Sequence, residues 1–285
     1  MKKKITLFDI IVGIFMILVG LVILYPILYV VSVSFSDTAS IVQNKITFYP
    51  KGFNLESYKM ILKDNRIPRA YLNTIIYTAA GTFVNLLMTC LGAYPLSKKT
   101  FFGRKFFVTA IVLTMFFSGG MIPTFIVVQK LKLVNSIWAL ILPNAIWTTQ
   151  LLILKSFYEN IPSSLYEAAI VDGASEYRIL FQIILPISKP ALASIALFYF
   201  MGHWNSYFIP LIYLNDLDKL PLQVILRDML INNTATDSNI MTTSKLTPEG
   251  LKNATIFISM VPVLIIYPFV QKYFAKGIML GSVKG

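Results

Sequence analysis

The residues best suited to chemistry with a partner protein lie in the segment 161–186, between two long apolar runs. Ser164 is followed three residues later by Glu167, which is the spacing of a capping box at the start of a helix. Leu165 and the small residues Ala168 and Ala169 then recur at helical spacing. Because alanine side chains are short, they leave a flat strip on which a groove of another protein could close.

The same segment contains the signals of a turn and a second helix. Gly173 follows the first predicted helix, and glycine permits the sharp turn that often ends a helix. We expect the second helix to run from about Ser175 until Pro186 halts it. The sequence therefore predicts a short helix-turn-helix element over residues 163–186 that protrudes from a larger body.

This segment also carries the pattern Glu-Ala-Ala, three residues, Gly, nine residues, Ile-x-Leu-Pro. It resembles the coupling motif of binding-protein-dependent ABC importer permeases. The resemblance implies that two cytoplasmic ATPase subunits grip the element. The implied ATPase-coupling residues are Glu167, Ala168, Ala169, Asp172, Gly173, Ile183, Leu185 and Pro186.

The resemblance covers nearly the whole chain. Segments 118–124, 138–143, 202–205 and 271–285 are similar to carbohydrate-uptake permeases, in the branch for complex oligosaccharides or polysaccharides. The chain looks like the maltose-type partner with six spans and a cytoplasmic C-terminal tail. This implies a type I ABC importer permease fold, a second homologous permease subunit in a heterodimer, an extracytoplasmic solute-binding protein and a carbohydrate substrate. It also implies a tail over residues 272–285 that contacts the ATPases through Lys276, Gly277 and Gly281.

The energy for transport must come from outside this chain. No glycine is followed at the fifth position by Gly-Lys-Ser/Thr, so the sequence has no phosphate-binding P-loop. The apolar runs also lack the buried charges that relay protons in secondary carriers. An ion-coupled carrier stays open as an alternative, because sodium sites can use carbonyls and hydroxyls. Two further alternatives also stay open: an ABC permease for a non-sugar solute, and a membrane-embedded enzyme or assembly scaffold.

Catalysis by the chain itself is not predicted. His203 is the only histidine and Cys90 the only cysteine, so neither a Cys/His pair nor a multi-histidine metal site is indicated, and no cofactor is expected. Cys90 is expected to be a packing residue. His203 is either a proton switch or a neutral histidine that is hydrogen-bonded within the helix bundle.

A path for a sugar would combine hydrogen-bonding side chains with aromatic rings. The fifth apolar run offers such a set, part of it at the three-to-four residue spacing of one helix face. The candidate substrate-path residues are Tyr199, His203, Trp204, Asn205, Tyr207 and Phe208. Asn85, Asn144, Trp147 and Gln150 are further polar or amphipathic residues within apolar runs. Whether they line a pore or bind neighbouring helices is left open, as is the alternative that the other permease subunit holds the sugar.

The composition indicates that membrane-spanning helices hold these residues in place. Apolar residues make up 56% of the 285-residue chain and charged residues 13%, too few charges to coat a soluble surface. The net charge is +12, and we expect the basic residues to interact with anionic lipid headgroups rather than with nucleic acid. Six nearly uncharged runs are long enough to cross a bilayer as helices. They cover residues 8–33, 70–96, 106–128, 133–154, 190–214 and 254–270, and predict an all-α membrane protein with six transmembrane helices in a single domain, 1–285.

The orientation is predicted from basic residues. Lys2, Lys3 and Lys4 precede the first run, which reads as a signal anchor, and a second basic group follows the second run. We therefore expect a multi-pass protein of the bacterial cytoplasmic membrane with both termini in the cytoplasm. Segments 97–105 and 155–189 would be cytoplasmic. Segments 34–69 and 215–253 would be exterior, with short helices at 54–62 and 220–227.

Overall fold

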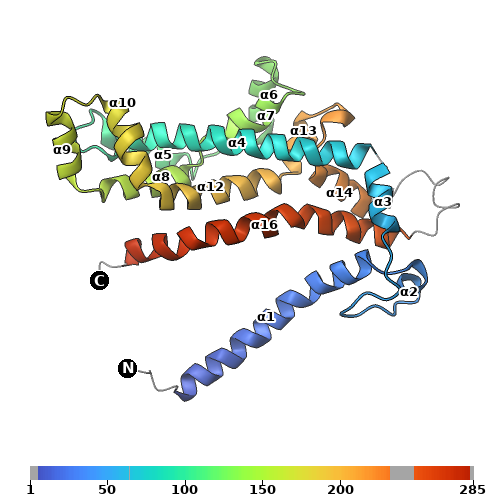
Figure 1. The fold of residues 1–285 in the computed structure, drawn as a ribbon. Coiled ribbons are helices and arrows are strands. Elements are labelled where there is room, and N and C mark those ends of the chain that lie inside the picture. Colours follow the sequence, from blue (N-terminus) through green and yellow to red (C-terminus); the bar gives the residue numbers. More distant parts are fainter. Residues whose placement is uncertain (1–5, 64, 232–246, 283–285) are drawn as a thin grey trace. The chain divides into compact units, whose positions relative to one another are not determined.

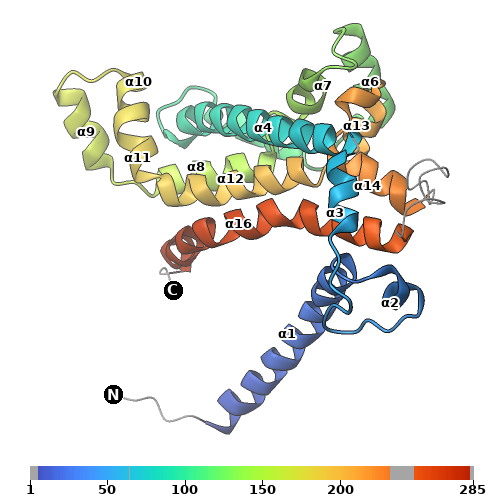
Figure 2. The ribbon, with the colours of Figure 1, turned by 45° about the vertical axis from the view of Figure 1, so that its right-hand side comes forward.

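The computed structural model describes residues 6–63, 65–231 and 247–282 of the chain. Every regular element within these ranges is a helix, and they contain no strand. The predicted all-α fold class is confirmed. Figures 1 and 2 show the helices in chain order from blue to red. Residues 2–4, on which the predicted orientation partly depends, lie outside the described residues.

The chain divides into two compact units. The first comprises Met1–Arg69 and Ile225–Pro262, and the second comprises Ala70–Val224 and Val263–Gly285. Three helices begin in one unit and end in the other: α4 (Arg66–Ser97), α14 (Leu222–Ile231) and α16 (Pro248–Ser282). The single domain over residues 1–285 stays a prediction.

The first unit begins with α1 (Leu7–Ser34), followed by α2 (Thr38–Val42) and α3 (Glu56–Lys63). A capping box starts α1, because the main-chain N–H of Asp9 donates to the Thr6 hydroxyl and the N–H of Thr6 donates to the Asp9 carboxylate. The 28 residues of α1 rise about 42 Å, more than the thickness of the hydrocarbon core.

A cluster of four aromatic rings packs at the C-terminal end of α1 in the first unit. The ring of Phe35 stacks on Tyr58 and Phe53, with centroids 4.9 and 5.7 Å apart, and meets the edge of Phe257 at 5.8 Å. Tyr58 lies on α3 and Phe257 on α16. These contacts fix the end of α1 against the beginning of α16 within this unit.

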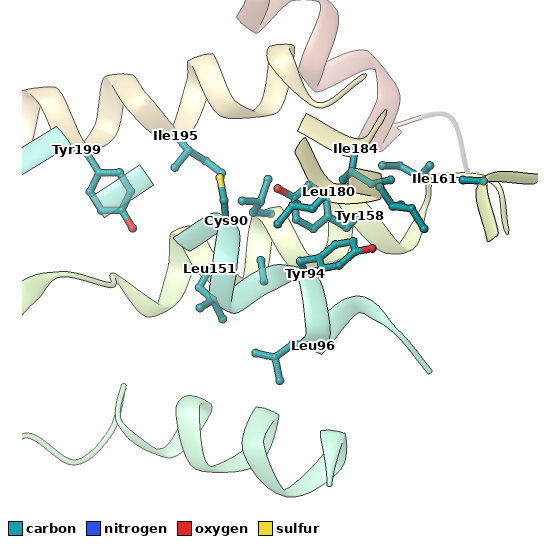
Figure 3. Packing of buried hydrophobic residues seen from close by; sticks show 14 residues of the cluster. Cys90, Tyr94, Leu96, Leu151, Tyr158, Ile161, Leu180, Ile184, Ile195 and Tyr199 are labelled. Carbon is teal, nitrogen blue, oxygen red and sulfur yellow. The ribbon is translucent and has the colours of Figure 1, made fainter. Parts of the chain in front are cut away.

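The second unit contains the rest of the described helices. After α4 these are α5 (Arg104–Leu113), α6 (Met121–Lys130), α7 (Ile137–Ile141), η1 (Leu142–Asn144), α8 (Thr148–Glu159), α9 (Ser163–Val171), α10 (Glu176–Ile179), η2 (Leu180–Ile184), α11 (Leu185–Ile187), α12 (Lys189–Trp204), α13 (Phe208–Tyr213) and η3 (Leu217–Lys219). A buried cluster joins α4, α8, the α9–α11 region and α12, as Figure 3 shows. Its labelled members include Tyr94, Tyr158, Leu180, Ile184 and Tyr199.

Three of the predicted spans are single helices. Leu7–Ser34, Arg66–Ser97 and Pro248–Pro268 are each long and apolar enough to cross a membrane. Two further candidates are pairs of helices with a sharp bend between them. Together with the α5–α6 pair, they are consistent with about six crossings, as predicted.

The prediction of a continuous third span over residues 106–128 is wrong. Helix α5 ends at Leu113, and α6 begins only at Met121. Between them, Gly120 has a φ of 83°, a backbone conformation that glycine adopts readily and other residues avoid. The Ser-Gly-Gly sequence before α6 therefore interrupts the apolar run.

The fourth and fifth spans are also broken. In the fourth, predicted over 133–154, the helices Ile137–Asn144 and Thr148–Glu159 meet at a bend of 54°. Pro143, which lacks an N–H, lies beside this break. The fifth, predicted over 190–214, stops at Trp204, and α13 resumes at Phe208.

The predicted helices in the two long connecting segments are confirmed as helices. The expected helix at 54–62 is α3, and the Asn54 side chain accepts a hydrogen bond from the N–H of Glu56 at 2.8 Å at its start. The helix expected at 220–227 is α14, which begins two residues later and extends to Ile231.

Candidate functional site

The segment singled out in the sequence forms two helical pieces joined by a tight turn. Helix α9 is followed, after the turn, by the continuous helical run Glu176–Ile187, which comprises α10, η2 and α11. This run meets α12 at a bend of 83°. The predicted helix-turn-helix shape is present, and Figure 1 shows α9 and α10 as two short helices joined by the turn.

The turn depends on Gly173, which has a φ of 72°. Its N–H donates to the carbonyl of Ile170 at 3.0 Å, and the N–H of Ala174 donates to the carbonyl of Ala169 at 2.9 Å. These two bonds make a Schellman motif, the hydrogen-bonded helix ending that places a left-handed residue just after the helix. No atom lies within 4 Å of a Cβ built at Gly173, so backbone conformation rather than crowding requires glycine there.

Two local details of the prediction are wrong. The capping box between Ser164 and Glu167 does not form, because α9 begins at Ser163 after Pro162, with no side-chain cap. Pro186 does not halt the second helix, which continues through Ile187. A π-helical stretch, η2, precedes Pro186, and its wider turn accommodates a residue that cannot donate a main-chain hydrogen bond.

The cap that does form belongs to the second helix. The hydroxyl of Ser175 accepts a hydrogen bond from the N–H of Arg178 at 3.4 Å. Glu176 then follows in the first turn, where a negative charge favours the positive end of the helix dipole.

The predicted coupling residues separate into two faces. Ala169 is buried, and Ile183 and Leu185 are partly buried, and all three pack in or against the cluster of Figure 3. This inner face also contains Ile179, Leu180 and Ile184, which are at most 3% exposed. The remaining coupling residues are exposed: Glu167, Ala168, Asp172, Gly173 and Pro186.

Large apolar side chains are exposed next to these residues. Val171 is 87% exposed and Tyr177 is 74% exposed, and Leu165, Ile170 and Phe181 are exposed as well. An apolar group at the surface of a segment outside the long spans is typical of a protein contact. Sequence reasoning missed Tyr177 and Phe181, although their four-residue spacing places them on one helix face.

Two basic residues, Arg104 at the start of α5 and Lys155 on α8, pair with Glu159 at the end of α8. The guanidinium of Arg104 pairs with Glu159 and also donates from Nε to the carbonyl of Leu96 at 2.8 Å. Lys155 lies 2.9 Å from the same Glu159 carboxylate. Partial burial raises the pKa of Glu159, but the bonds and charges of Lys155 and Arg104 outweigh it and hold the pKa below its usual value.

The predicted substrate-path residue Tyr199 is fully buried in the second unit, at 0% exposure. Its hydroxyl lies 2.6 Å from the hydroxyl of Thr89 and accepts a hydrogen bond from the N–H of Trp147 at 3.3 Å. Trp147 directly precedes α8, so this bond pairs an N–H that the broken helix leaves free. Tyr199 therefore joins α12 to α4 and to the break before α8.

His203 makes a similar connection. Its Nε2 lies 2.7 Å from Oδ1 of Asn85, whose Nδ2 donates to the carbonyls of Asn144 and Ala145. Because the Asn85 oxygen faces the ring, Nε2 of His203 must carry the hydrogen. Gly81 makes the approach possible, since a Cβ there would lie 2.5 Å from Nε2. Of the two roles left open, this geometry is that of a hydrogen-bonded histidine.

The other substrate-path residues differ in their exposure. Trp204 is 2% exposed and packs against Tyr71 and Phe200. Asn205 is exposed and donates to the carbonyl of Met201 at 3.0 Å. Tyr207 and Phe208 are 42% and 48% exposed. The structure thus brings Tyr199, His203 and Trp204 into the packing between helices, and leaves Asn205, Tyr207 and Phe208 exposed.

The C-terminal tail is helical as far as it is described. Helix α16 continues through Ser282, and residues 283–285 lie outside the described residues. The predicted tail residues Lys276, Gly277 and Gly281 fall within this helix. Cys90 is 7% exposed and lies in the buried cluster, as expected of a packing residue.

Residues 6–280 match the model of the family described as "Binding-protein-dependent transport system inner membrane component". The chain is 42% identical to the polygalacturonan/rhamnogalacturonan transport system permease protein YtcP of Bacillus subtilis, over 100% of both chains. It is 30% identical to the trehalose/maltose transport system permease protein MalG of Thermococcus litoralis, over 94% of this chain and 94% of that protein.

A solved structure matches over almost the whole chain. It is the crystal structure of a bacterial ABC transporter involved in the import of the acidic polysaccharide alginate. One of its chains superposes with a TM-score of 0.90 at 34% identity, covering 94% of this chain and 96% of that one.

Proposed function

Because the chain belongs to the family of binding-protein-dependent transport system inner membrane components, we propose that it is one permease subunit of an ATP-driven oligosaccharide importer. A second, homologous permease subunit completes the pore, and an extracytoplasmic binding protein delivers the sugar. Two cytoplasmic ATPase subunits supply the energy, since this sequence has no P-loop. The observation that carries the proposal is the helix pair over residues 163–187, packed on its inner face and exposed on its outer face.

The exposed face of this pair is suited to a protein groove. Glu167 and Asp172 offer carboxylates, Ala168 keeps the surface flat, and apolar side chains such as Val171 remain exposed. The inner face packs through Ala169 into the cluster that also holds α4, α8 and α12. When ATP closes the ATPase subunits, a pull on the outer face is therefore passed to these three helices.

We infer a second ATPase contact at the C-terminal tail, residues 272–285. Helix α16 extends beyond the predicted sixth span, which ends near residue 270, so the chain continues as helix on the far side of the membrane. Lys276, Gly277 and Gly281 lie on this extension. Their contribution is proposed from the resemblance to permeases with cytoplasmic tails.

The proposed orientation has both termini and the coupling element in the cytoplasm of a bacterial cell. Two ion pairs support the placement of two connecting segments on the same side of the membrane. Arg104 pairs with Glu159, and Lys98 pairs with Glu176, so segments 97–105 and 155–189 lie on the same side of the membrane. The basic residues of the first segment favour the cytoplasmic side, and segments 34–69 and 215–253 then face the binding protein.

The proposed substrate is an oligosaccharide, and uronic-acid oligomers are the first to test. The B. subtilis relative is named for polygalacturonan and rhamnogalacturonan, and the structural relative imports the acidic polysaccharide alginate. Within this chain, Asn205, Tyr207 and Phe208 expose polar and aromatic side chains of the kind that a sugar needs. Tyr199, His203 and Trp204 would act by holding the helices that present them.

The proposal is tested by reconstituting the permease with its companion permease, ATPase subunits and binding protein in proteoliposomes. Uptake of labelled oligogalacturonides, neutral oligosaccharides and amino acids is measured with and without ATP on the side of the membrane that carries the ATPase subunits. We expect ATP-dependent uptake of an oligosaccharide. Transport that proceeds without the ATPase subunits would identify an ion-coupled carrier, and uptake of amino acids alone would exclude the sugar assignment.

A further inference from the structure

A lysine at the end of α4 lies between both helices of the coupling element. Lys98 follows Ser97, the last residue of α4. Its Nζ lies 4.7 Å from the ring centroid of Tyr94 and 5.6 Å from that of Tyr166, and it pairs with the carboxylate of Glu176. We name Tyr94, Lys98, Tyr166 and Glu176 the Lys98 cluster.

The four residues come from three different elements. Tyr94 belongs to α4, Tyr166 to α9 and Glu176 to α10, while Lys98 follows α4 directly. The hydroxyl of Tyr94 donates to the same oxygen of Glu176 at 2.6 Å. One ammonium group and one carboxylate therefore connect the end of a membrane helix to both halves of the coupling element.

The surroundings of Lys98 distinguish this cluster from an ordinary surface ion pair. The Lys98 side chain is only 23% exposed, and Tyr94 is 7% exposed within the buried cluster. A pair between freely exposed side chains contributes little to structure because water screens it and both chains stay mobile. Two aromatic faces and a hydroxyl fix the Lys98 ammonium and its carboxylate in one arrangement.

We propose that Lys98 is a positioning residue, which holds the coupling element in a fixed orientation on α4 so that movement of the element is transmitted to that helix. The inference rests on the proposed function. None of the four residues belongs to the Glu-Ala-Ala pattern, and Tyr94, Lys98 and Tyr166 are buried or partly buried, while Glu176 is 60% exposed. Lys98 therefore acts through the element rather than by touching the ATPase.

The packing explains why such a residue is needed. Buried apolar residues, among them Ala169, Ile179 and Leu180, hold the inner face of the element, but apolar contact has no preferred direction. The helix pair could rock on this surface while it remained packed. Bonds from one fixed ammonium and one carboxylate to α4, α9 and α10 remove that freedom because they require a single geometry.

The test uses the complete transporter in proteoliposomes and the variant Lys98→Met, which keeps an unbranched side chain of similar length and removes its charge. We expect subunit assembly to persist, and sugar uptake per ATP hydrolysed to fall about fivefold or more. Lys98→Arg, which retains the charge and the aromatic contacts, should restore most of the ratio. Lys99→Met is the matched control, because this neighbouring lysine is exposed, and it should leave the ratio unchanged.

A second measurement follows the orientation directly. In a Cys90→Ser background, spin labels are placed at Leu91 on α4 and at Val171 at the end of α9, both of which are exposed. We expect Lys98→Met to broaden the distance distribution between the labels, and Lys99→Met to leave it as in the wild type. This measurement also decides the case in which Lys98→Met fails to assemble with its partners, since it is made on the isolated full-length permease.

The outcomes separate the inference from the proposed function. If the wild-type complex shows no ATP-dependent uptake, the proposed function fails. If wild-type uptake is normal and Lys98→Met matches it in uptake per ATP, the positioning role of Lys98 is wrong and the importer assignment stands. An unchanged distance distribution in Lys98→Met contradicts the positioning role in the same way.

Discussion

The side-chain amide of Asn85 donates to the main-chain carbonyl of Asn144 at a distance of 2.6 Å. The same nitrogen reaches the carbonyl of Ala145 at 3.0 Å. A helix that breaks inside a membrane leaves such carbonyls without partners, and each costs several kcal/mol in lipid. Asn85, which is 0% exposed, supplies the missing donor from α4 and so stabilises the bend before α8.

Replacing Asn85 should destabilise the permease. We expect Asn85→Leu to lower its stability by about 1–3 kcal/mol, because the main-chain carbonyls of Asn144 and Ala145 and the Nε2–H group of His203 lose their partner. The measurement is the thermal unfolding midpoint of the detergent-solubilised protein. Asn205→Leu is the control, since this residue is exposed and its amide donates to the carbonyl of Met201 one turn earlier in the same helix region. Equal midpoints for the two variants would show that the bend does not depend on Asn85.

The close approach of Gly202 on α12 to Trp147, which directly precedes α8, gives a second prediction. A Cβ at this position would lie 2.2 Å from the indole of Trp147, a distance that requires the ring to move. We expect Gly202→Ala to cost about 1–3 kcal/mol through overpacking and to shift the tryptophan fluorescence. Gly119→Ala is the control, because no atom lies within 4 Å of a Cβ there. A Gly202→Ala spectrum and midpoint like those of the wild type would contradict the packing described.

The turn at Gly173 predicts a loss of coupling. Any L-residue is strained by about 1–2 kcal/mol in the left-handed conformation, and a β-branched one suffers most. Gly173→Val should therefore distort the end of α9 and lower uptake per ATP hydrolysed, while the protein remains inserted. Gly173→Asn should retain most activity, because asparagine tolerates this conformation. If Gly173→Val and Gly173→Asn gave the same uptake per ATP hydrolysed, the left-handed backbone conformation would not explain why glycine is required at this position.

Acid should weaken the bonds of Glu176. Hydrogen bonds from Lys98, and then from Tyr94, hold the pKa of Glu176 below its ordinary value of 4.5. A carboxyl with a lowered folded-state pKa stabilises the fold above 4.5, and this stabilisation is lost as pH falls through the folded-state pKa. The unfolding midpoint of the wild type should exceed that of Glu176→Gln near neutral pH. The difference should shrink at a pH below 4.5, and a constant difference would rule out this linkage.

Much of the architecture could be predicted from the sequence. The apolar runs predicted the first, second and sixth spans, because a continuous uncharged stretch of that length has few alternatives to a membrane helix. The spaced Glu167, Ala168, Ala169 and Gly173 identified the family, and the family match and structural superposition confirm that assignment and its all-α importer fold. Gly173 also marked the turn, since its left-handed backbone is a local property.

The breaks within the spans were missed because hydropathy averages over them. Leu113, Gly120 and Pro143 stand in runs that remain apolar, so length alone suggested continuous helices. The Ser-Gly-Gly sequence before Met121 was the signal that could have revealed the interruption in the third span. The capping box at Ser164 does not form because Pro162 takes the N-cap position, so the helix begins two residues earlier than the pattern predicts.

The contacts that organise the site could not be predicted from one sequence. Lys98 and Glu176 are separated by 78 positions, and Asn85 and His203 by 118. No local pattern links such pairs, since they meet only after the helices pack. For the same reason, Tyr199 and His203 were assigned to a sugar path from their residue types, while the structure gives both of them hydrogen-bond partners between helices.

The proposed function requires the exposed face of α9 to contact an ATPase encoded elsewhere. The most direct test places a photo-crosslinking residue at Ala168 or Val171 in the assembled transporter, with Leu91 on α4 as the control position. We predict crosslinks to the ATPase subunits from Ala168 and Val171, and none from Leu91. If neither Ala168 nor Val171 crosslinks to an ATPase subunit in an assembled, ATP-hydrolysing transporter, α9 is not the ATPase contact.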